Sequence, residues 1–168
     1  MSRLARVRNG GAFTLAEMLV VLSLLAIFAG MVVVLVRGRQ DTHALQVSTK
    51  DLAAAIRMAS TETKAKQRPH RVAFYGNCRE FRLEAAAGGT GDYAPVIGVG
   101  GMKRRLAGSV RIDAVLRADG EPIEPAPDQL GFQPGGQGFS GRVRLVNRAG
   151  ETMQIEVMNA TGQVNVLE

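Results

Sequence analysis

Residues 18–36 form a run of 19 residues without a charged side chain, reading MLVVLSLLAIFAGMVVVLV. As a helix that rises about 1.5 Å per residue, this run would be roughly 28 Å long, which matches the hydrocarbon core of a bilayer. Ser23 is its one strongly polar side chain, and a serine hydroxyl in a helix can donate to the carbonyl one turn earlier. The run therefore predicts a membrane-spanning helix.

The charges on either side of this run predict its orientation. Three arginines precede it with no acidic residue among them: Arg3, Arg6 and Arg8. Such an excess favours a cytoplasmic amino terminus, and a long following chain is translocated even with Arg37 and Arg39 directly after the span. The alternatives are a simple signal anchor or a secretory signal cut near Ala29. A charged Glu17 and an apolar run that continues past Ala29 are not typical of a cleavable signal.

The residues that lead into the run read GGAFTLAE at positions 10–17, and they resemble the processing site of type IV pilins and type II secretion pseudopilins. The family pattern is Gly followed by Phe-Thr-Leu-x-Glu. The resemblance implies that a prepilin peptidase cuts between Ala12 and Phe13, that the new amine of Phe13 is N-methylated, and that Glu17 is fifth in the mature chain. Ala12 stands where the family almost always has glycine. A cut after Gly11 would place Glu17 sixth, so the cut before Phe13 fits the pattern better.

Glu17 lies at the border of the apolar run, where a carboxylate is costly unless it finds a cationic partner. Residues four apart share a helix face, so Glu17 would stand one turn from the amine released at Phe13. In the resembled family, this glutamate is thought to pair with the amine of the neighbouring subunit, which turns a buried charge into a register device for a filament. We therefore interpret Glu17 as an assembly residue.

The sequence after residue 36 predicts a pilin-like α+β fold. Apolar or small residues recur there at helical spacing: Leu45, Leu52, Ile56, Ala59 and Thr63. No proline follows until Pro69, so the helix is expected to continue to about Lys66. Alternating segments then predict antiparallel strands at residues 71–75, 80–85, 110–116, 131–133, 142–146, 153–158 and 163–167, with a tight turn at 159–162. The expected architecture is a long N-terminal helix, transmembrane and then amphipathic, packed on an antiparallel β-sheet domain.

These interpretations divide the chain into four segments. They are a prepilin leader at 1–12 that is removed, a transmembrane helix segment at 13–36, a periplasmic continuation of the helix at 37–67, and a periplasmic β-rich domain at 68–168. Within that domain, the glycine-rich stretch 86–101 and the proline-rich stretch 118–128 are interpreted as irregular surface loops. Such loops serve either as filament contacts or as connectors.

The carboxy-terminal third narrows the resemblance. The sequence GFQPGG at residues 131–136, a valine-rich strand, and the ending NATGQVNV at 159–166 resemble the H class of minor pseudopilins, a pattern shared by FimT-type minor pilins. The resemblance implies a single-pass protein of the inner membrane with a periplasmic C-terminal domain. Its implied partners are the prepilin peptidase and other major and minor pseudopilins, and its implied role is in a pseudopilus that supports protein export.

Catalytic and metal-binding patterns are not found in the sequence. Cys78 is the single cysteine, which excludes an intrachain disulfide, and it lies in no nucleophile signature with His43 or His70, so a structural thiol is expected. Both histidines are expected at the surface. The acidic residues of the proline-rich loop lack calcium-loop spacing: Asp119, Glu121, Glu124 and Asp128. We therefore expect no enzymatic activity and no cofactor, with a cation site in this loop as the minor alternative.

DNA binding is the alternative function that the charge suggests. The net charge is +6, but removal of the three leader arginines leaves 18 basic and 15 acidic side chains. Basic clusters at residues 64–71 and 103–105, with Arg142 and Arg144 on one strand face, could contact phosphates as in a FimT-like minor pilin that binds DNA during uptake. Gln163 and Asn165 stand where a nucleic-acid binder would place arginines. A membrane-tethered enzyme would require a cleft of convergent polar residues, and the sequence locates none.

Mass spectrometry of the purified mature protein tests the cleavage prediction. We expect a chain that has lost residues 1–12 and begins at a methylated Phe13, because this cut restores both Phe first and Glu fifth. A chain that begins at Met1, or one that begins near Gly30, would show that the segment is processed in another way.

Overall fold

The computed structural model describes residues 14–88, 91–123, 130–135, 138–158 and 163–167, with side chains omitted at 32–38 and 123. The chain divides into two compact units, Met1–Arg37 and Gly38–Glu168. The leader, the predicted cut between Ala12 and Phe13, and the predicted turn at 159–162 lie outside the described residues.

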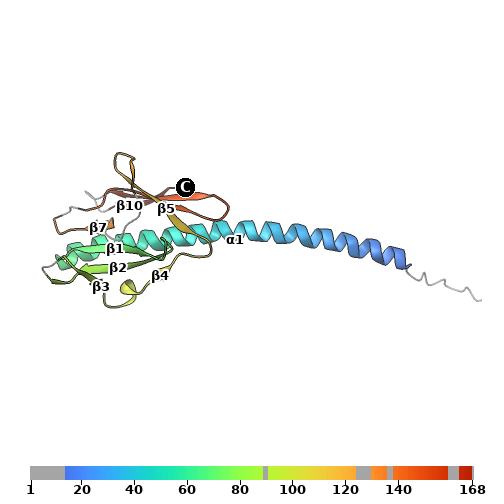
Figure 1. Ribbon diagram of the computed structural model, residues 1–168, viewed down its shortest axis with the longest axis horizontal. Coiled ribbons are helices and arrows are strands. Elements are labelled where there is room, and N and C mark those ends of the chain that lie inside the picture. Colours follow the sequence, from blue (N-terminus) through green and yellow to red (C-terminus); the bar gives the residue numbers. More distant parts are fainter. Residues whose placement is uncertain (1–13, 89–90, 124–129, 136–137, 159–162, 168) are drawn as a thin grey trace, which may run out of the picture. The chain divides into compact units, whose positions relative to one another are not determined.

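The helix α1 (Leu15–Lys66) is the long amino-terminal element (Figure 1). It begins after Thr14, whose side-chain oxygen and carbonyl both accept from the N–H of Glu17, at 3.2 and 3.1 Å. It ends at Lys66 because Gln67 takes a left-handed conformation with φ 49°, and Pro69 cannot continue a helix. Lys64 and Lys66 in the last turn complement the negative end of the helix dipole. The predicted helix and its predicted end are confirmed.

The apolar stripe predicted for the second half of α1 forms the core of the unit Gly38–Glu168. All five predicted positions are buried: Leu45, Leu52, Ile56, Ala59 and Thr63. The hydroxyls of Thr49 and Thr63 donate to helix carbonyls one turn earlier, at 2.8 Å each. Two threonines can therefore be buried on this face without unsatisfied polar atoms.

Sheet A contains the strands in the order β3–β2–β1–β7, and β4 also pairs with β2. Their bounds are β1 (His70–Tyr75), β2 (Glu80–Ala86), β3 (Tyr93–Pro95), β4 (Arg104–Arg105) and β7 (Leu130–Phe132). All pairs are antiparallel, and the β1–β2 hairpin places Arg71 opposite Glu84 and Tyr75 opposite Glu80. This register brings charged side chains together on one face of sheet A.

Sheet B contains the strands in the order β10–β9–β8–β5–β6, again antiparallel. Their bounds are β5 (Arg111–Arg117), β6 (Pro122–Ile123), β8 (Gly141–Val146), β9 (Thr152–Met158) and β10 (Gln163–Leu167). Gln163 pairs with Met158, so the predicted final hairpin is confirmed. All seven predicted strands are present, with bounds that differ by one residue or less at each end.

The buried face of α1 and the inward faces of both sheets share one core, and Figure 1 shows the second half of α1 running along both sheets. Phe81 and Leu83 enter it from sheet A, and Leu145 and Ile155 enter it from sheet B. Two polar contacts reinforce the packing of the helix. Arg57 Nη2 donates to the Val164 carbonyl at 2.6 Å, and the Ala107 N–H donates to Ser48 Oγ at 2.8 Å.

The two stretches predicted as irregular are only partly so. The first contains β3 and a 3₁₀ turn, η2 (Val99–Gly101), and the second contains β6. These strands have two or three residues, and pairing with β2 and β5 positions them. Such short elements depend on their neighbours in the fold and leave no periodic pattern in the sequence.

Among the described residues, no helix combines the length and the hydropathy needed to cross a bilayer. The division of the chain into leader, membrane, helical and periplasmic segments therefore stays a prediction.

A pair of matched substitutions tests the central role of the helix in the core. Leu52 is fully buried, whereas Leu22 is 61% exposed. We expect Leu52→Ala to lower the free energy of unfolding of the globular unit by about 2–5 kcal/mol, because it removes buried methyl groups and leaves a cavity. Urea unfolding in detergent, followed by circular dichroism, measures the change. Leu22→Ala is the control, and an equal loss of stability in both variants would contradict the described packing.

Candidate functional site

The candidate assembly residue Glu17 lies in the first turn of α1 and is exposed. Thr14 precedes the helix and Glu17 is its third residue, the Thr-x-x-Glu spacing of a capping box. Thr14 satisfies the N–H of Glu17 at 3.2 Å, and the Glu17 carboxylate stands at the positive end of the helix dipole. The capping role of Thr14 was not predicted, although the spacing that signals it is readable in the sequence.

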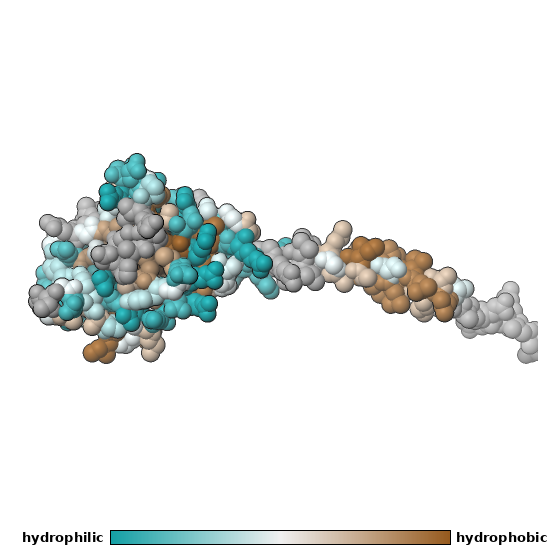
Figure 2. Space-filling model, viewed as in Figure 1, coloured by the Kyte–Doolittle hydropathy of each residue, from teal (hydrophilic) through white to brown (hydrophobic). Residues whose placement is uncertain are grey.

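The described part of α1 in the unit Met1–Arg37 carries apolar side chains that remain exposed. Leu15, Leu22 and Phe28 are 79%, 61% and 63% exposed, and Figure 2 shows this stretch as hydrophobic. Ser23 Oγ donates to the Leu19 carbonyl at 2.8 Å, as predicted, so its hydroxyl does not interrupt the apolar surface. An apolar surface of this extent is typical of a segment that contacts lipid or other proteins.

Several of the basic residues proposed for DNA contact are paired with carboxylates. Arg142 and Arg144 share one face of β8, as predicted, because they alternate with buried Val143 and Leu145. Arg142 lies 3.2 Å from Glu156, and Arg144 lies 2.8 Å from Asp113. Arg104 also lies 3.4 Å from Asp51. These partners neutralise the positive charge that these three arginines would offer to a phosphate.

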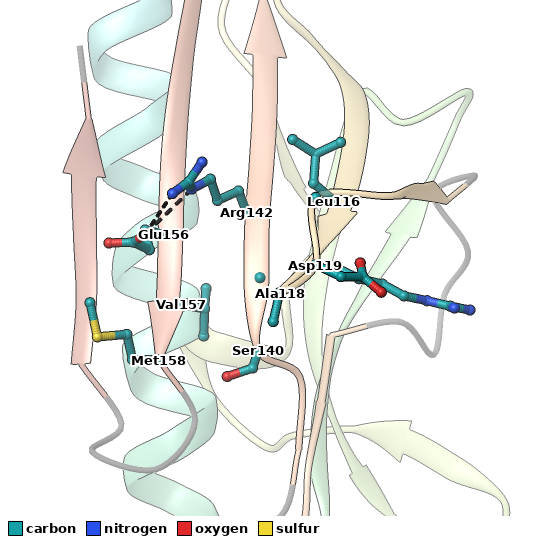
Figure 3. A pocket seen from close by; sticks show the side chains of 11 residues that line it. Leu116, Ala118, Asp119, Ser140, Arg142, Glu156, Val157 and Met158 are labelled. Atoms are coloured by element: carbon teal, nitrogen blue, oxygen red, sulfur yellow. Dashed lines mark hydrogen bonds and ion pairs between the residues drawn. The ribbon is translucent and has the colours of Figure 1, made fainter.

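A pocket of about 320 Å³ lies at one end of sheet B (Figure 3). Ser140, Asp119 and the Arg142–Glu156 ion pair are among the side chains that line it. Gly141 belongs to its wall, and only glycine fits there because a Cβ would lie 2.1 Å from the Leu116 carbonyl oxygen. None of the described residues that line it is a histidine or a cysteine. The pocket thus has a serine hydroxyl but no imidazole beside it to act as a base.

Cys78 and the two histidines occupy separate environments. Cys78 is half-buried against the core, and burial raises the pKa of its thiol, which agrees with the predicted structural thiol. His43 is exposed, but the prediction of a surface position was wrong for His70, which is 1% exposed. His70 Nδ1 donates to the Arg68 carbonyl at 2.7 Å and lies 3.3 Å from Thr63 Oγ1. A satisfied polar contact in the core explains its burial.

The acidic loop offers no cation site in its described part. Within the described residues, no group of three or more histidine, cysteine or acidic side chains is arranged to hold a metal ion. Asp119 accepts from the N–H of Glu121 at 3.1 Å, which shapes the β5–β6 turn. Glu124 and Asp128 lie outside the described residues.

A cluster of charged and aromatic side chains lies on the face of sheet A that points away from the core. We call it the Glu84 cluster, and its members are Arg71, Tyr75, Arg82, Glu84, Tyr93 and Lys103. Glu84 is 1% exposed, although it alternates with core residues along β2 and so faces outward. Arg71 Nε donates to one carboxylate oxygen at 2.8 Å, and Arg82 Nε donates to the other at 2.7 Å. The Tyr75 hydroxyl donates to that second oxygen as well.

In this cluster, basic side chains lie over the rings of both tyrosines of the chain. The Arg71 guanidinium lies 4.1 Å from the centre of the Tyr93 ring. The Arg82 guanidinium and the Lys103 ammonium lie 4.6 and 4.9 Å from that of Tyr75. Such cation–π contacts hold the long basic side chains in fixed positions over the sheet. The cluster cannot be predicted from a sequence motif, because Arg71 and Glu84 are brought together by the register of β1 and β2.

Glu84 makes the stability of the domain depend on pH. Burial alone would raise the pKa of this carboxyl, but the hydrogen bonds from Tyr75, Arg71 and Arg82 outweigh it and leave the pKa lowered. A lowered pKa in the folded state means that Glu84 stabilises the fold above the unfolded pKa of about 4.3. That contribution is lost as the pH falls through the folded value.

Unfolding experiments with Glu84→Gln test this dependence. We expect the variant to be less stable than the wild type by about 3 kcal/mol at pH 7, because it leaves two half-buried guanidinium groups without their buried counter-charge. The difference should shrink as the pH falls below about 4.3. Urea unfolding at several pH values measures it, with the exposed Glu121→Gln as the control. A difference that does not vary with pH would contradict the assignment.

Comparison with known proteins identifies a sequence motif at the amino terminus and structures of similar fold. Residues 8–33 match the family described as the prokaryotic N-terminal methylation motif. A comparison with curated protein sequences gives no match. Two solved structures of the minor pseudopilin EpsH from the type II secretion system of Vibrio cholerae are similar in fold, with TM-scores of 0.56 and 0.58 at 15% and 14% sequence identity.

These similarities extend over most of this chain and over nearly all of each EpsH chain. The first EpsH structure is matched over 73% of this chain and 95% of its own length, and the second over 74% and 94%. The predicted pilin-like α+β fold is therefore confirmed. The chain combines the prokaryotic N-terminal methylation motif with the pilin-like fold of a minor pseudopilin.

Proposed function

We propose that this protein is a minor pseudopilin that assembles into the periplasmic pseudopilus of a type II secretion system and so supports export of folded proteins across the outer membrane. One observation carries the proposal. A methylation motif at residues 8–33 leads into a helix with an exposed apolar surface, and the same chain has the EpsH fold. A filament subunit needs these features, whereas a soluble binding domain has no use for the first two.

The proposed topology follows from the sequence around the apolar run. The three leader arginines favour a cytoplasmic amino terminus, and residues 13–36 would lie in the inner membrane with the domain in the periplasm. The prepilin peptidase would cut before Phe13 on the cytoplasmic face. Before secretion begins, the subunit would thus be stored in the membrane by its own helix.

The proposed role of Glu17 depends on its position at the start of α1. An exposed carboxylate there is available to a neighbouring chain, because the cap contact described for this turn uses Thr14 and backbone atoms. In a medium of low dielectric, a carboxylate and an ammonium attract strongly, and either one alone is costly. Pairing between Glu17 and the amine of the next subunit would therefore select one helix register.

The proposed mechanism needs no catalytic group and no cofactor, since assembly and extension of the filament move other proteins. The pocket of sheet B is consistent with this, because its serine has no neighbouring imidazole among the lining residues. DNA uptake is the alternative function. The ion pairs of Arg142 and Arg144 count against it, because these cations already have carboxylate partners.

Secretion in the bacterium of origin tests the proposal. We expect Glu17→Ala to leave exoproteins in the periplasm while the subunit itself accumulates in the membrane, because the loss falls on assembly and not on folding. The exposed Glu121→Ala is the control for removal of a carboxylate and should secrete normally. Fractionation followed by immunoblotting of exoprotein and subunit gives both readouts. Normal secretion with loss of DNA uptake in Glu17→Ala would favour the FimT-like alternative instead.

A further inference from the structure

The Glu84 cluster has more positive charge than its fold requires. Arg71, Arg82 and Lys103 are gathered around a single buried carboxylate. On the same face, β2 and β4 add one further carboxylate and one further cation, Glu80 and Arg105, which are paired in register. Among these described residues, the outward face of sheet A has an excess of two positive charges. One positive charge is enough to neutralise Glu84, so the excess is not needed for the burial of this carboxylate.

The two arginines of the cluster are positioned by their contacts with Glu84. Arg71 contacts Glu84 through Nε at 2.8 Å, and its side chain stays 20% exposed. Arg82 contacts it through both Nε and Nη2, at 2.7 and 2.6 Å. Arg71 is therefore positioned by Glu84 and Tyr93, and a partly exposed guanidinium can bind an incoming carboxylate through its terminal N–H₂ groups. Because the side chain is already ordered, little conformational entropy is lost on binding.

The composition of the cluster favours a protein partner. Arginine and tyrosine are the residues that most often dominate binding energy at protein interfaces, particularly around a desolvated centre. Glu84 at 1% exposure provides such a centre. Nucleic-acid binders use open aromatic faces for stacking, whereas Tyr75 and Tyr93 already have cations over their rings.

We infer that the outward face of sheet A is a docking site for an acidic segment of a partner protein, whose carboxylates are bound by Arg71 and Lys103 across the Glu84 cluster. The inference does not rest on the proposed function, because the cluster belongs to the globular unit and needs neither cleavage nor filament assembly to bind. A failure of the secretion experiment would leave it standing, and its own failure would leave the pseudopilin proposal standing.

Peptide binding to the full-length protein in detergent tests the inference. The probe is a fluorescein-labelled peptide of alternating glutamate and alanine, and the same peptide with glutamine in place of glutamate is its control. We expect fluorescence anisotropy to show binding of the glutamate peptide that weakens with salt. Lys103→Glu should weaken it by about tenfold, because it replaces one charge-assisted contact with repulsion. Lys50→Glu makes the same charge change at an exposed position on α1 and should leave binding within about twofold.

A second variant separates a specific guanidinium contact from net charge. The double substitution Arg71→Gln/Glu84→Gln removes the guanidinium and its buried counter-charge together, so the net charge is unchanged. It should still weaken peptide binding by about tenfold. Three results would overturn the inference: equal binding of the glutamine peptide, an equal loss in Lys50→Glu, or tighter binding of a twelve-nucleotide single-stranded DNA through Lys103 and Arg71.

Discussion

The packing of one face of α1 against two sheets is the contact on which the globular unit depends. Leu52 and Ile56 have no exposed surface, and strands of both sheets meet them in a single core. The buried face of the helix and the inner faces of both sheets contribute to this one core, so the helix is its shared centre. Since burial of such side chains contributes about 1.5–3 kcal/mol each, this face of the helix contributes a substantial part of the stability of the unit.

The helix, its stripe and the longer strands could be predicted because each leaves a local periodicity. Leu45 to Thr63 follow a 3.6-residue pattern, and β1, β2, β8 and β9 alternate between core and outer face. The strands β3, β4 and β6 are too short to show any period, and they exist because β2 and β5 offer unpaired edges. For the candidate site, sequence reasoning gave Glu17 and overlooked the cap at Thr14.

The Glu84 cluster and His70 could not be predicted, and for one physical reason. Alternation correctly places Glu84 on the outer face of β2, and an outer glutamate is expected in water. Its burial arises only when the hairpin register sets Arg71 opposite and Tyr75 nearby. His70 is similar, because the turn after α1 brings it to Thr63 and the Arg68 carbonyl. Polar groups are buried where the fold supplies partners, which no single segment of sequence contains.

The cap at Thr14 limits how far the start of the helix can shift. The helix begins at Leu15, only two residues beyond the proposed cut, so very little chain separates the new terminus from the first turn. A cut displaced by one residue would change the distance along the chain between the new amine and Glu17 by one residue. Each residue of a helix corresponds to a rotation of about 100° and a rise of about 1.5 Å. In a filament of pseudopilins, such an offset would shift the helix of this subunit against the helix of its neighbour. The accuracy of the peptidase would then decide whether this subunit fits its place in the filament.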